Sequence, residues 1–307
     1  MFIEFGSTLT VTSASSTVRG ILAIKTGSTA EINGLLQFGV AAHRLTAVDA
    51  GAIHFKSGGE LKVLATYPTA STAFPLGTGA GGTTNGALNS VIFETGSTFT
   101  QLSGQNPFGT NSPLTSTSVA TFNSGSNFYF QVASTSVNLP SRTYGNLTVN
   151  RAGNLNISSS VTPFYAENIN VLNGSVQLAG NFAMTVKGNI AVSSGTSIAF
   201  NPSAEQNFNF AGDDQVISGS GTVSFNNKSS LIIPSGRTVT LANNILVDRL
   251  ITVNGTLDAA SKAITGVGGI TEPLAYAVHR FLDHFNHQCP AHASRSTKEV
   301  GVAVAEV

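Results

Sequence analysis

The sequence has few charges, a single cysteine and no tryptophan. Its 307 residues include 15 basic and 15 acidic side chains, 10% of the chain, whereas soluble proteins have about 25%. The net charge of zero removes the basic surface typical of nucleic-acid-binding proteins, so we expect no nucleic-acid partner. Cys289 alone excludes an internal disulfide framework, although it leaves the cellular compartment open. No apolar run approaches the ~18 residues of a membrane-spanning helix, so we expect no membrane span.

Short segments of alternating polar and apolar residues fill most of the chain. This alternation, with β-branched and aromatic side chains, predicts strands that bury one face. Examples are residues 7–11, 60–64, 127–131, 197–200 and 238–241. Glycine paired with serine or asparagine separates the segments and indicates tight turns. Successive strands begin roughly 7–12 residues apart, which leaves no room for crossover helices, so the sequence predicts an all-β protein.

The chain contains a long internal repeat. Residues 145–171 align with residues 221–247 without a gap, so that Gly145 matches Gly221 and Leu155 matches Leu231. With small insertions the similarity extends to residues 122–189 and 200–266. A repeat of this length predicts one structural unit stacked on itself, which favours an extended surface over a pocket.

Two all-β architectures fit this pattern, an antiparallel sandwich and a parallel β-solenoid. The repeat and the many Asn, Ser and Thr residues favour a right-handed parallel β-helix over residues 1–270. With roughly 20–27 residues per coil and about 4.8 Å between coils, the rod would be roughly 50 Å long. Segments rich in Pro, Gly and Thr predict long loops at about 65–90 and 104–118. An uncapped solenoid would also allow end-to-end self-association.

Residues 271–307 do not belong to the repeat. Glu272 and Pro273 are placed as a helix start, and the apolar spacing predicts a helix over about 273–288 that Pro290 ends. Histidines and the only cysteine gather here, and imidazole and thiolate are ligands for a transition metal such as zinc. The spacing matches no established site. We therefore predict that the chain binds no metal. If it does bind one, His284, His287 and Cys289 are the candidate ligands.

No catalytic or cofactor-binding residues are predicted. A β-helix enzyme usually needs carboxylates clustered on one face, but the acids are scattered and only Asp213 and Asp214 are adjacent. These two aspartates lie where a turn is expected, a position that favours Asp for local hydrogen bonding. The glycine-rich segment 77–84 lacks the lysine of a phosphate-binding loop. The sequence therefore predicts no enzyme and no cofactor.

Several phrases resemble repeats in very large secreted surface proteins of Bacteroidetes and Chlorobi-type bacteria. They are NPFGTNSP, TYGNLTVN, LIIPSGRTVTLANNILV and ITVNGTLDAASKAITGVGG, and the resemblance covers roughly residues 1–270. Those proteins are typically exported by the type IX secretion system, and their repeats look like β-solenoid or adhesin-like rods. The resemblance implies a structural or adhesive role at the cell surface or outside the cell.

Three departures from the family accompany this resemblance. The sequence shows no signal peptide and no C-terminal sorting domain, and residues 272–307 replace the strand that usually follows. We therefore expect an internal piece of a longer protein. The sequence leaves open whether its tail is a shifted reading frame, an unrelated fusion, or a genuine segment that caps the solenoid. Partners would be surface glycans or neighbouring cells, in weak and multivalent contacts. The alternatives are a β-helix carbohydrate-active enzyme and a glycan-binding module.

Overall fold

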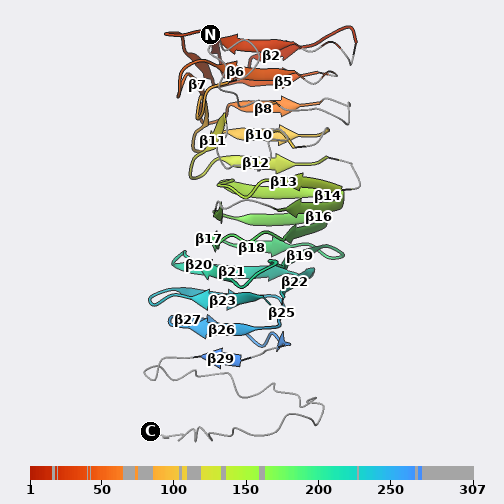
Figure 1. Ribbon diagram of the computed structural model, residues 1–307, viewed down its shortest axis with the longest axis vertical. Coiled ribbons are helices and arrows are strands. Elements are labelled where there is room, and N and C mark those ends of the chain that lie inside the picture. The colour runs from red at the N-terminus through yellow and green to blue at the C-terminus, as the bar shows by residue number, and fades with distance from the viewer. Residues whose placement is uncertain are drawn as a thin grey trace, which may run out of the picture.

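The computed structural model shows a parallel β-solenoid with its rungs stacked along the long axis (Figure 1). It describes residues 1–15, 18, 20–39, 41, 43–64, 73–74, 86–103, 106–108, 119–132, 136–158, 163–226, 228–266 and 269–271. The secondary structure assigned to these residues is all-β, and the pairs between strands are parallel. The predicted β-solenoid is therefore confirmed, and the antiparallel sandwich is excluded. The helix predicted over 273–288 lies outside the described residues.

Three columns of strands run along the rod, one strand per column in most rungs. The first column contains β1 (Phe2–Ile3), β4 (Ala30–Ile32), β7 (Ile53–Phe55), β9 (Val91–Phe93), β11 (Ala120–Phe122), β15 (Phe164–Ala166), β17 (Met184–Val186), β20 (Gln206–Phe210), β23 (Ser229–Ile233), β26 (Leu250–Val253) and β29 (Gly269–Thr271). The second contains β2 (Thr8–Val11), β5 (Leu35–Phe38), β8 (Glu60–Val63), β10 (Thr98–Gln101), β12 (Asn127–Phe130), β18 (Ile190–Val192), β21 (Asp214–Gly219), β24 (Thr238–Leu241) and β27 (Thr256–Asp258). The third contains β3 (Ile21–Ile24), β6 (Arg44–Ala47), β13 (Ser136–Leu139), β19 (Ser197–Phe200), β22 (Thr222–Phe225), β25 (Ile245–Val247) and β28 (Ile264–Thr265).

Two long strands join the second and third columns. Residues 147–149 of β14 (Asn146–Ile157) and 169–171 of β16 (Ile169–Leu178) pair within the second column, and their later residues pair within the third. The register shifts between these two parts, which marks an irregular corner. The first column is interrupted at the same level, because β11 and β15 belong to separate sheets and Thr143, in the rung between them, forms only an isolated bridge to Tyr165 of β15. The middle of the rod thus differs in construction from both ends.

Alternation along each strand sends every second side chain into the core. In β12, Phe128 and Phe130 are fully buried while Tyr129 faces outward. Equivalent positions of successive rungs lie directly above one another, so like side chains stack. Phe93 stacks on Phe55 and Phe122 with ring centroids 4.5 and 4.6 Å apart and planes within 10° of parallel. Burial of this continuous apolar column supplies most of the driving force for folding.

Glycines occupy the turn between the first and second columns, where the backbone is left-handed. Gly58, Gly96 and Gly125 have φ of +82°, +77° and +74°, a region that other residues enter at a cost. Their backbones also pair, since the Gly58 amide donates to Gly96 and the Gly96 amide to Gly125, at 3.0 and 2.8 Å. The predicted turn glycines therefore form a column of their own.

The sequence repeat does not coincide with the structural columns. Leu147 lies in the second column and stacks through Ile169 and Ile190 onto Ile217. Its counterpart in the repeat, Val223, lies in the third column, in β22. The two copies keep the same alternation of strands and turns but are offset by one column, so equivalent residues do not lie above one another.

Candidate functional site

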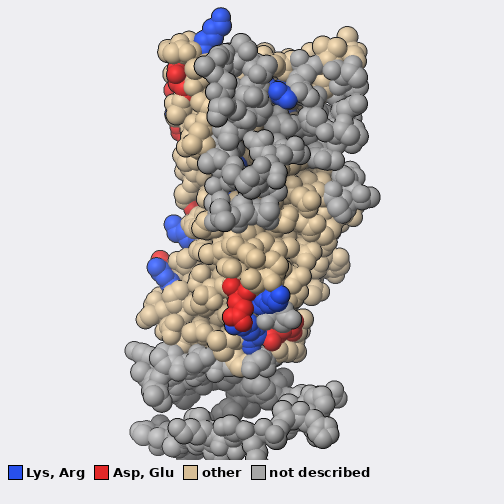
Figure 2. Space-filling model, viewed as in Figure 1, with Lys and Arg blue, Asp and Glu red and all other residues tan. Residues whose placement is uncertain are grey.

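The surface of the middle rungs carries no formal charge over a long stretch. Between Glu94 and Glu167 the sequence has no acidic residue, no lysine and no histidine. Its two basic residues, Arg142 and Arg151, are 6% and 1% exposed. We call residues 95–166 the neutral band. The centre of the face in Figure 2 is largely uncharged, whereas acidic and basic side chains gather over the last rungs.

Hydroxyl and amide side chains form columns on the outside of this band. In the second column Tyr129 and Thr148 face outward at equivalent positions of successive rungs. In the third column Asn138 and Asn156 do the same. Because neighbouring strands lie about 4.8 Å apart, donors and acceptors recur along the rod at that spacing. This arrangement can present regular polar contacts to an extended ligand.

Part of the polar surface is already used for internal hydrogen bonds. The amide of Asn146 donates to Asn127 at 3.1 Å, and that of Asn168 donates to Asn146 at 2.8 Å. Asn168 in turn accepts from the backbone N–H of Asn189 at 2.7 Å. This asparagine ladder ties four rungs together at one corner, which is a structural role.

Glu167 spans two rungs at the neighbouring corner. Its carboxylate accepts hydrogen bonds from the Ser124 hydroxyl and from the Gly125 N–H, the latter at 2.5 Å. The intervening rung has Gly145 at its turn, with φ of +61° and no side chain. The first carboxylate beyond the neutral band is therefore engaged in holding the fold.

Glu94, on the other side of the band, belongs to a small ionic cluster. It accepts from Lys56 Nζ and contacts His54 Nδ1, both at 2.7 Å, and His54 Nε2 lies 2.8 Å from the Gly51 carbonyl oxygen. The hydrogen bond from Lys56 holds the pKa of Glu94 below its usual 4.5. The cluster is about one-third exposed and lacks a second carboxylate, so it resembles a surface ion-pair network more than a catalytic pair.

The two adjacent aspartates lie at a turn, as predicted. Residues 211–213 connect β20 to β21, and Asp214 begins β21. Asp213 forms an ion pair with Arg237 and is 85% exposed, and nearby Glu205 pairs with Arg249 at 2.6 Å. Within the described part of the chain no three His, Cys, Asp or Glu side chains are grouped to hold a metal. The candidate ligands His284, His287 and Cys289 lie outside that part.

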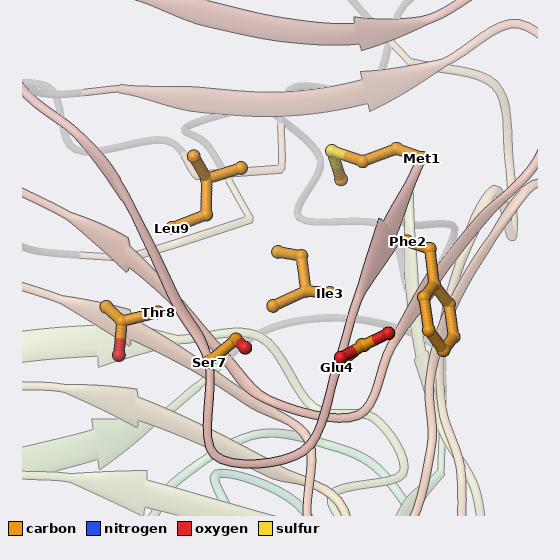
Figure 3. Close-up of a pocket in the computed structure, with 7 residues that line it drawn as sticks. All are labelled: Met1, Phe2, Ile3, Glu4, Ser7, Thr8 and Leu9. Carbon is orange, nitrogen blue, oxygen red and sulfur yellow. The ribbon is translucent and has the colours of Figure 1, made fainter.

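The first rung has a shallow hollow of about 330 Å³ lined by residues of β1 and β2 (Figure 3). Ile3 and Leu9 face it, while the ring of Phe2 turns outward and is 60% exposed. Phe5, in the turn that follows, is 82% exposed. This apolar end is where the predicted end-to-end self-association would take place, and that association stays a prediction.

Buried polar groups mark two further places. His43 is 2% exposed, its Nδ1 accepts the Gly20 N–H at 2.9 Å, and burial lowers its pKa below 6.5. Tyr144 is fully buried, donates to the Pro140 carbonyl at 2.5 Å, and burial raises its pKa above 10. Neither lies in a group of titratable side chains suited to catalysis.

Comparisons with known proteins give no relative. No family model, no curated protein and no solved structure matches this chain. Nor do the described residues contain a helix long and apolar enough to cross a membrane. We therefore infer the function from the sequence and from the surface of the solenoid.

The sequence shows the neutral band as a stretch without acidic residues, but it does not show which of its side chains lie on the surface. An uncharged stretch could equally have been buried. Only the strand register shows that Tyr129, Thr148 and Asn156 face outward while both arginines are buried.

Proposed function

We propose that this chain is a structural and adhesive segment of a secreted bacterial cell-surface protein, built as a right-handed parallel β-solenoid. The solenoid fold and the resemblance of residues 1–270 to secreted surface repeats support this proposal. The role is mechanical: stacked rungs pair backbone groups along the axis and hold a polar surface rigid. Binding comes from that surface.

The neutral band is the observation that carries the adhesive part. Its outward Thr, Asn and Tyr side chains match the hydroxyl groups of neutral glycans, and its outer surface carries no formal charge. Each contact is weak, and recurrence along the rod supplies avidity. Because no ion pairs contribute, binding to a neutral polysaccharide should hardly change between low and high salt.

A matched pair of substitutions tests this surface. Thr148 and Thr240 both face outward in the second column, one inside the neutral band and one outside it. Thr148→Asp should weaken binding to an immobilised neutral polysaccharide about tenfold, because contact would desolvate an unpaired carboxylate. Thr240→Asp should leave it unchanged. Equal effects of the two changes, or no binding by the unmodified chain, would contradict the proposal.

The cell-surface location has its own test. Intact cells of the source bacterium should be labelled by antibodies against the solenoid, and brief protease treatment should remove that label. A label that appears only after lysis would contradict the location without affecting the glycan result.

The alternative functions need chemistry that the described residues do not bring together. A β-helix carbohydrate-active enzyme requires paired carboxylates in a groove, whereas Asp213 is tied to Arg237 and Glu94 to Lys56. A glycan-binding module with an aromatic platform would normally use tryptophan, which the chain lacks. No structural observation favours either over the adhesive solenoid.

A further inference from the structure

Arg142 lies inside the solenoid, where the first column is interrupted. Its side chain is 6% exposed, and its guanidinium carbon lies 3.9 Å from the ring centre of Phe108 and 5.6 Å from that of Phe122. One nitrogen, Nη2, donates to the Ala120 carbonyl oxygen. Aromatic rings and one carbonyl group are therefore the contacts that the structure gives this cation.

Two of its other donors have no partner among the residues that the structure describes. Nε and Nη1 of Arg142 are buried there and make no hydrogen bond. Arg151, the other buried arginine, differs in this respect, since its Nε donates to Val132 at 3.0 Å and its Nη1 to Asn154 at 2.5 Å, both backbone carbonyls. Buried donors are normally satisfied, so the unpartnered edges of Arg142 indicate a missing acceptor.

None of the carboxylates in the described part of the chain neutralises Arg142. The neutral band has no Asp or Glu, so the loops within it cannot supply one either. The flanking acids are engaged elsewhere, Glu94 by Lys56 and His54, and Glu167 by Ser124 and Gly125. Burial lowers the pKa of Arg142 to about 10, so the group is still protonated at neutral pH. A buried cation without a counter-charge is strongly unfavourable.

We propose that Arg142 binds a small inorganic anion inside the solenoid, with chloride as the simplest representative. An anion at an edge of the guanidinium would accept from the free N–H groups and also neutralise the charge. A water molecule could accept these hydrogen bonds but could not neutralise the charge. The burial of the side chain limits the site to a small ion. The anion would stabilise the interrupted level of the rod between β11 and β15.

Unfolding of the full chain in chloride and in gluconate at equal ionic strength tests this proposal. Above the Kd, each tenfold rise in chloride should raise the ratio of folded to unfolded protein about tenfold. Arg142→Met should lose this dependence, whereas Arg151→Met should keep it because its donors already have acceptors. The same chloride dependence in Arg142→Met and in the unmodified chain would overturn the proposal.

A second measurement needs no variant. Crystals of the unmodified chain grown in bromide should show an anomalous peak within hydrogen-bonding distance of the Arg142 guanidinium. Water or a loop carbonyl at that place, with no peak, would overturn the proposal. If Arg142→Met does not fold, the bromide result decides.

Discussion

The phenylalanine column makes a quantitative prediction about stability. Phe93 is fully buried and stacks on Phe55 and Phe122, with Phe74 and Phe99 at its edges, at centroid distances of 4.5 to 6.0 Å. Each aromatic pair contributes about 0.5–1.5 kcal/mol beyond the area it buries, so losing the two stacked pairs costs about 1–3 kcal/mol. Imperfect repacking around leucine adds about 1 kcal/mol. Phe93→Leu should therefore reduce the free energy of unfolding by roughly 2–4 kcal/mol.

Phe210 is the matched control. It is equally buried, but among the described residues Phe208 is its one aromatic neighbour, at 5.1 Å, so Phe210→Leu should cost about 1.5–2.5 kcal/mol. Guanidinium unfolding followed by circular dichroism would give both values. A double-mutant cycle of Phe93 with Phe122 should show a coupling of about 0.5–1.5 kcal/mol. If Phe93→Leu costs no more than Phe210→Leu, or if the coupling is zero, stacking does not contribute as argued.

Three further predictions concern a buried histidine, a turn and the asparagine ladder. The pKa of His43 is lowered on folding, so the unfolded chain binds the proton more readily than the folded one. The free energy of unfolding should therefore fall as the pH drops below 6.5, by at most about 1.4 kcal/mol per pH unit. Unfolding measured over pH 5–8 should show that His43→Asn loses this pH dependence. Gly145→Ala should destabilise the fold by more than the roughly 1–2 kcal/mol that an alanine in left-handed backbone costs, because its Cβ would lie 2.5 Å from a carbonyl oxygen. Gly195 is also left-handed but has open space around it, so Gly195→Ala should cost only roughly 1–2 kcal/mol. Thermal unfolding of both variants would measure the difference. Asn168→Ala removes two ladder hydrogen bonds and should cost about 1–2 kcal/mol, but Asn170→Ala, whose single bond is 3.5 Å long, should cost less in the same denaturation assay.

Much of the fold could be predicted because its signals are local. Strands such as β8, β12 and β24 follow from alternation within four or five residues, and their turns follow from neighbouring glycines. The predicted coil length also holds where no loop intervenes: Ile169 and Ile190 are stacked partners 21 residues apart. Between Leu61 and Phe99 the spacing grows to 38, and residues 65–90, for which the sequence predicts a loop, fall within this interval. The alternation of polar and apolar residues does not predict how many loop residues separate one strand from the next strand of the same column.

The candidate site was less predictable. The missing acids of residues 95–166 are plain in the sequence, but charge alone does not say which side chains face solvent. Arg151 varies between the repeat copies and so resembles a surface residue, yet the corner of β14 buries it against backbone carbonyls. Burial of Arg142 depends on Phe108 and Phe122, which come from two different rungs. Contacts of this kind are invisible until the rungs are stacked.

The sequence by itself determined that this chain is made of short one-sided strands joined by tight turns, because alternation and turn chemistry act over a few neighbouring residues. Only the tertiary structure decided which column each strand joins. Leu147 and Val223 look equivalent in the repeat, but they lie in the second and third columns. The physical reason is that the inward positions of all three columns are filled by the same kind of residue, an apolar side chain. The choice among them is made by loop lengths and by the corner in β14, through pairing between residues distant in the chain.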